Sequence, residues 1–77
     1  MLGDKREVEA IDKAGSGQKI NPFDQQILRK LANDPDLSVE ERQACARRAE
    51  GKETFRDREI LAQLRRRVVP SARRPDD

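Results

Sequence analysis

Only sixteen of the 77 residues are Leu, Ile, Val or Phe, and this scarcity of large apolar side chains limits what the chain can fold into. Charged residues make up 42% of the sequence, so little apolar area is available to offset the entropy lost when the chain becomes ordered. A chain of this length forms one domain at most. We therefore expect its stability to come from regular helices, from self-association or from a partner.

The apolar side chains recur at helical spacing, and no run alternates as a half-buried strand does. The predicted fold class is all-α, a small domain of three to four short helices with a helical hairpin or three-helix core. The predicted organisation is a short charged helix with a Gly/Ser linker at residues 1–20, a helical core domain at 21–70 and a disordered tail at 71–77.

Capping residues set the expected helix ends. The expected helices span residues 4–14, 22–33, 39–50 and 55–69. Asn21, Ser38 and Thr54 are suitable N-caps, and the last two stand three residues before an acidic side chain, as in a capping box. Gly15 is expected to end the first helix and open the linker, and Gly51 to end the third.

The helices differ in how much apolar area they are expected to contribute to the core. At about 100° per residue, the helix at 55–69 has one apolar stripe, which consists of Ile60, Leu61, Leu64 and Val68. The helix at 39–50 has a weaker inward face of small side chains, which consists of Val39, Cys45, Ala46 and Ala49. Phe23 and Phe55 are interpreted as core side chains.

The sequence contains no histidine, which is the commonest general acid–base near neutral pH and a frequent metal ligand. The single cysteine, Cys45, therefore has no histidine to activate it and is interpreted as a small buried thiol. The carboxylates alternate with Lys and Arg at the spacing of helix-surface pairs. We predict no enzymatic activity, no cofactor and no metal site.

A lone cysteine cannot form an internal disulfide, and the sequence has no secretory signal or membrane-spanning apolar run. These features predict a cytoplasmic protein that does not associate with a membrane.

The charge pattern at the C-terminal end is more informative than the net charge of +2. No carboxylate stands three or four positions before Arg65, Arg66 or Arg67, so their charge is not neutralised within the helix. An apolar stripe edged by arginines is suited to an acidic or apolar groove of another protein. The predicted partner-binding residues are Arg56, Arg58, Leu61, Leu64, Arg65, Arg66, Arg67 and Val68. The hypothesis is a small regulatory, adaptor or inhibitor protein, and a homodimer is an alternative use of the same stripe.

Two other interpretations stay open. Residues 39–69 are compatible with a helix-turn-helix regulator in which Thr54, Arg56 and Arg58 begin the recognition helix. Its phosphate contacts would come from Arg65, Arg66, Arg67, Arg73 and Arg74. Alternatively, the arginines only complement the helix dipole and keep the chain in solution.

Overall fold

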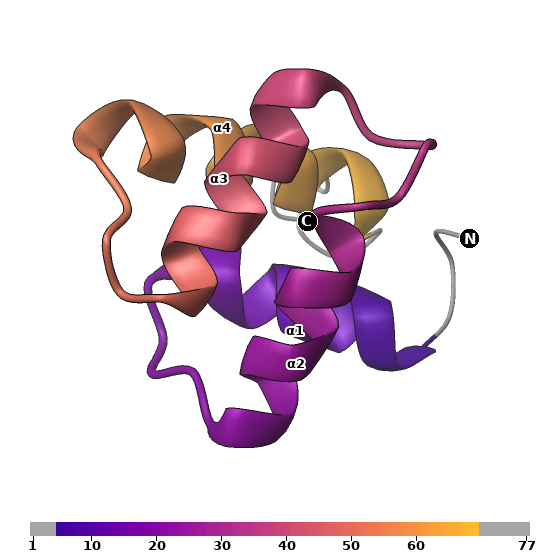
Figure 1. The fold of residues 1–77 in the computed structure, drawn as a ribbon, viewed down its shortest axis with the longest axis vertical. Coiled ribbons are helices and arrows are strands. Elements are labelled where there is room, and N and C mark those ends of the chain that lie inside the picture. The colour runs from indigo at the N-terminus through magenta and orange to yellow at the C-terminus, as the bar shows by residue number, and fades with distance from the viewer. Residues whose placement is uncertain (1–4, 70–77) are drawn as a thin grey trace, which may run out of the picture.

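The computed structural model describes residues 5–69, which form four helices around one core (Figure 1). The helices are α1 (Lys5–Ser16), α2 (Pro22–Leu31), α3 (Val39–Ala49) and α4 (Phe55–Val68). Each helix packs on its neighbours in sequence, and α1 also packs along α4, so the four elements close into a ring of contacts. The all-α prediction is confirmed. The tail predicted at 71–77 lies outside the described residues.

The three predicted N-caps are confirmed. The Asn21 side chain accepts a hydrogen bond from the Asp24 backbone N–H at 2.7 Å. Ser38 and Thr54 each form a complete capping box, in which the cap side chain and the acidic side chain three residues later both accept backbone bonds. Each box satisfies two backbone donors that a helix start leaves free, so these starts depend only on local sequence.

The predicted end of the first helix is wrong. α1 continues through Gly15 to Ser16, and Gly17, with φ of 80°, follows its last turn. Gly15 lies where α1 crosses α4: a Cβ added there would be 2.6 Å from the Leu61 carbonyl oxygen. The glycine is therefore needed for close helix packing rather than for a linker.

α1 also belongs to the same core as the other helices. Its Ala10, Ile11 and Ala14 are buried in one cluster with the leucines of α2 and α4. Among the residues that the structure describes, α1 therefore supplies one wall of the core.

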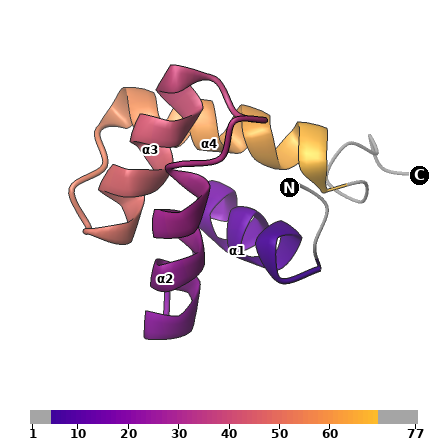
Figure 2. The ribbon, with the colours of Figure 1, turned by 45° about the vertical axis from the view of Figure 1, so that its right-hand side comes forward.

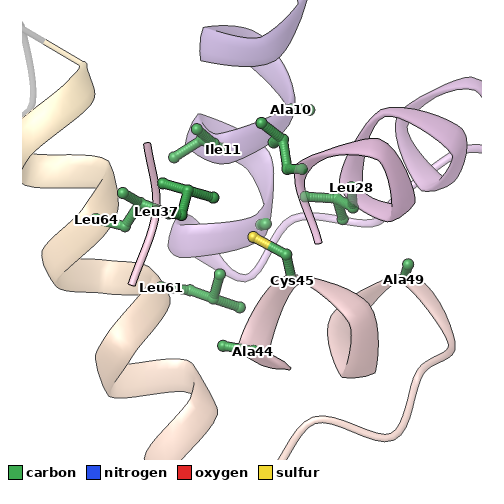
Figure 3. Packing of buried hydrophobic residues seen from close by; sticks show 11 residues of the cluster. Ala10, Ile11, Leu28, Leu37, Ala44, Cys45, Ala49, Leu61 and Leu64 are labelled. Carbon is green, nitrogen blue, oxygen red and sulfur yellow. The ribbon is translucent and has the colours of Figure 1, made fainter. Parts of the chain in front are cut away.

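Small side chains allow α3 to approach its neighbours closely. Ala44, Cys45 and Ala49 are its buried residues, and Figure 3 shows Cys45 and Ala44 directed at the leucines of the other elements. Cys45 and Ala49 were expected in the core, whereas Ala44 was missed. Val39 is 59% exposed, so its core assignment is wrong. Val39 is the first residue of the helix and lies about 120° from Cys45 around the axis.

Arg48 of α3 joins α1 to the rest of the domain. Its guanidinium donates hydrogen bonds to the carbonyl oxygens of Ala14 (3.4 Å) and Gln18 (2.6 Å), and it lies 3.5 Å from the Glu53 carboxylate. These carbonyls belong to the end of α1 and the residues after it, where backbone acceptors lack helical partners. A cation at this negative end of the helix dipole is favourable.

Asp57 at the start of α4 makes a pH-dependent contribution to the stability of the folded domain. Its buried carboxylate accepts hydrogen bonds from the Thr54 N–H (2.9 Å) and the Arg47 guanidinium (2.9 and 3.2 Å). Burial by itself would raise the pKa of Asp57, but these bonds and the Arg47 charge hold that pKa below its ordinary value. The resulting stability is present above the unfolded-state pKa and is lost as pH falls through the folded-state value.

We therefore expect Asp57→Asn to lower the free energy of unfolding by about 1–2 kcal/mol at neutral pH. The difference from wild type should shrink below about pH 4. Urea denaturation at several pH values measures both effects. Glu59→Gln, at an exposed carboxylate of the same helix, is the control and should change little. A difference for Asp57→Asn that stays constant down to the acid limit would contradict this explanation.

Candidate interaction surface

The described residues contain no cluster of three or more His, Cys, Asp or Glu side chains that could hold a metal ion. Cys45 is fully buried among apolar side chains. Burial, together with the negative charge of Glu41, raises the pKa of its thiol to about 12. Because the thiolate is the nucleophilic form, Cys45 is unsuited to covalent chemistry in the folded protein.

We expect Cys45 to resist labelling by a thiol reagent such as 5,5′-dithiobis(2-nitrobenzoate) at mildly alkaline pH while the domain is folded. The reason is that the sulfur is both inaccessible and protonated. The absorbance of released thionitrobenzoate measures the reaction. The same protein in guanidinium chloride is the control and should react with one equivalent. Rapid labelling of the native protein would show that Cys45 is more accessible than its packing indicates.

The stripe on α4 faces the interior. Leu61 and Leu64 are 0% and 1% exposed, while Ile60 and Val68 are partly buried against the same core. Figure 3 shows both leucines extending from α4 toward the space that holds Ile11, Leu37 and Cys45. The assignment of Leu61 and Leu64 to a partner-binding surface is therefore wrong for the folded domain, because α1 and α3 already cover them.

Most of the arginines beside the stripe have partners in other helices. Their ion pairs are Arg65 Nε with Asp12 Oδ1 at 2.6 Å, Arg67 with both oxygens of Glu41 at 3.0 and 3.1 Å, and Arg56 with Glu40 at 3.1 Å. Ion pairs between side chains as exposed as these contribute about 0–1 kcal/mol each to the stability of the domain. They nevertheless neutralise the charges of Arg65 and Arg67, which have no carboxylate partner within their own helix. Arg73 and Arg74 lie outside the described residues.

Two arginines of α4 remain available. Arg58 and Arg66 are exposed, and neither forms an ion pair within residues 5–69. At 100° per residue Arg66 lies on the side of α4 away from the buried leucines, about 140° from Leu61, whereas Arg58 lies at the edge of the buried face, about 60° from Leu61. About 12 Å of helix separates the two arginines. Val68, the last predicted contact residue, is partly buried and lies outside this face.

An exposed aromatic ring lies close to Arg66 around the α4 axis, about 20° from it. Phe55 is 78% exposed, so its assignment to the core is wrong. Helical periodicity could have shown this, because Phe55 is 180° from Leu64 around the α4 axis. We call Phe55, Arg58 and Arg66 the α4 outer surface. Sequence reasoning assigned the two arginines to binding but missed the aromatic residue.

A depression of about 540 Å³ borders this surface at Arg58. Lys19, Arg48 and Glu53 also line it, together with the end of α1 and the residues that follow. Arg48 is already bound to backbone carbonyls and to Glu53, so the depression contains a structural network. Lys19 is exposed and adds a third cation near the α4 outer surface.

The helix-turn-helix interpretation loses two of its three base-reading residues. The Thr54 hydroxyl accepts the Asp57 N–H at 3.1 Å as the cap of α4, and Arg56 pairs with Glu40. Glu59 is exposed on α4 as well and would repel phosphates. Of the three predicted base-reading side chains, that of Arg58 has neither an ion pair nor a capping hydrogen bond within the described part of the chain.

Comparison with protein-family models, curated proteins and solved structures gives no significant match. None of the helices within residues 5–69 is long and apolar enough to cross a membrane. The residues of the surface itself therefore carry the functional argument.

Proposed function

We propose that this protein is a small non-enzymatic adaptor or inhibitor that binds another protein through the α4 outer surface. The observation that carries the proposal is the exposure of Phe55 in a domain that is short of large apolar side chains. Transfer of a phenylalanine side chain from water into an interface contributes about 1.5–3 kcal/mol. Phe55 would therefore be the anchor of the interface, as buried aromatic residues commonly are.

The unpaired arginines indicate the chemistry of the partner. Arg58 and Arg66 follow Phe55 along α4, about 4.5 and 16.5 Å further along the axis, and would pair with carboxylates on one side of an apolar pocket. Such charges raise the association rate and select an acidic partner. A second copy of this chain is less suitable, because the same face would bring like charges together.

The Thr54 hydroxyl and the Arg56 guanidinium are held by internal contacts and are less available to base edges, so this helix is a poorer ligand for nucleic acid than for a protein. The free thiol of Cys45 and the absence of a membrane-spanning helix among the described residues support a cytoplasmic location as part of the proposal.

Site-specific photocrosslinking tests this function. Phe55→benzoylphenylalanine in the cells that encode the protein should give a covalent adduct with an acidic protein that survives nuclease treatment. Adding Arg58→Glu and Arg66→Glu should lower the yield about tenfold, which corresponds to roughly 1.4 kcal/mol of binding free energy.

Phe23→benzoylphenylalanine is the matched control, because Phe23 is also exposed, at 52%, but belongs to α2. The same adducts from both positions would show that the crosslinks are unspecific. The absence of an adduct at position 55, or an adduct lost on nuclease treatment, would contradict the proposal.

A further inference from the structure

The outward side of α2 carries positive charge without an exposed carboxylate. Arg29 and Lys30 are exposed, and neither has an ion pair within residues 5–69. The one acidic residue of this helix, Asp24, is buried and is held by the Lys13 ammonium at 3.0 Å. The other described helices each expose a carboxylate: Glu9 in α1, Glu40 in α3 and Glu59 in α4. α2 is therefore the one described helix with a purely basic outer side.

The same side of α2 also carries the neutral side chain of Gln26 and, at its start, the aromatic ring of Phe23. Gln26 is exposed one turn before Lys30. The Arg6 guanidinium lies over the Phe23 ring, 5.5 Å from its centroid, at the start of α2. Figure 2 shows the N-terminal half of α2 extending beyond the other three helices. We call Gln26, Arg29 and Lys30 the α2 outer surface.

We propose that the α2 outer surface binds the phosphate backbone of duplex DNA, independently of the α4 outer surface. Regularly spaced phosphates match cations on a face that lacks exposed carboxylates. Amide side chains such as that of Gln26 donate hydrogen bonds to phosphate or to base edges. The major groove is about 12 Å wide and admits an α-helix with its side chains, whose diameter is about 10–12 Å.

An acidic protein is a weaker fit to this surface. Protein interfaces depend on an apolar anchor, and the Phe23 ring, which is 52% exposed and has Arg6 over one face, offers less apolar area than Phe55 does. Arg29 and Lys30 also lie in the last turn of α2, where cations complement the helix dipole. A purely structural role would make their replacement lower the stability of the domain without changing any DNA affinity.

Fluorescence anisotropy with a labelled random-sequence DNA duplex tests the proposal. With two to three phosphate contacts, the affinity of the wild type should fall about 10- to 40-fold when the salt concentration rises fourfold. The double variant Arg29→Gln with Lys30→Gln should bind at least about tenfold more weakly at low salt and lower the salt slope by about 2.

The matched control is Arg58→Gln with Arg66→Gln, which removes the same charge from α4 and should retain most of the DNA affinity. Gln26→Glu leaves both cations in place and should also weaken binding, which tests the surface if the double variant proves less folded by circular dichroism. Equal losses for the two double variants would overturn the proposal, since only net charge would then matter. It would also be overturned by no DNA binding at low salt, or by polyglutamate binding as tightly as DNA.

Discussion

Replacement of Leu64 by alanine is expected to lower the free energy of unfolding by about 2–5 kcal/mol. Leu64 is almost completely buried at the centre of the cluster that joins α4 to α1, so its truncation leaves a cavity in the core. A domain of this length has a total stability of roughly 4–12 kcal/mol, so the variant should lose a large part of it. Urea denaturation followed by far-ultraviolet circular dichroism measures the change.

Phe55→Ala is the informative control, because it removes a larger side chain from the same helix. It should change the stability by less than about 0.5 kcal/mol, since Phe55 is exposed and has little packing to lose. The two variants together separate the core face of α4 from its outer surface. Equal destabilisation by both, or none by Leu64→Ala, would contradict the orientation of α4 described above.

Gly15→Ala is expected to destabilise the domain by about 1–3 kcal/mol, although alanine is the better helix former by about 1 kcal/mol. A Cβ at this position would lie 2.6 Å from the Leu61 carbonyl oxygen and 2.7 Å from the Arg65 Cβ. Neither atom belongs to the flexible end of a side chain, so α1 and α4 would have to move apart. Their separation would loosen the Arg65–Asp12 pair and the packing of Ile11 together.

Ser16→Ala, at the exposed neighbouring position of α1, is the control for helix propensity. It should leave the urea midpoint within the small range of ordinary surface substitutions, about 0.5 kcal/mol. If Gly15→Ala instead raised the midpoint, the close crossing of α1 and α4 would not exist in solution.

The helix starts could be predicted because each cap bond joins residues three positions apart. The side chains of Asn21, Ser38 and Thr54 meet backbone groups within their own first turn, so no distant contact is needed. The end of α1 could not be predicted in this way. Gly15 and Gly17 both satisfy the rule that a glycine commonly ends a helix, and the contact of Gly15 with α4 is what shows that Gly17 follows the last turn.

The candidate surface was predictable only in part. Arg65, Arg66 and Arg67 all lacked a carboxylate one turn earlier, but only Arg66 has no ion pair within residues 5–69, and the sequence did not distinguish it from Arg65 and Arg67. Their partners lie 53 and 26 residues away, beyond the reach of any rule about neighbouring turns. Phe55 was misassigned because an aromatic side chain was taken as core without regard to its angle around the helix.

The helices, the N-caps of α2, α3 and α4 and the apolar stripe on α4 follow from hydrogen bonds and periodicity that act over three or four residues. Tertiary packing decided what covers that stripe and which guanidinium groups stay unpaired. Burial and cross-helix ion pairing depend on distances between segments far apart in the chain, and those distances exist only after α1 has packed against α4.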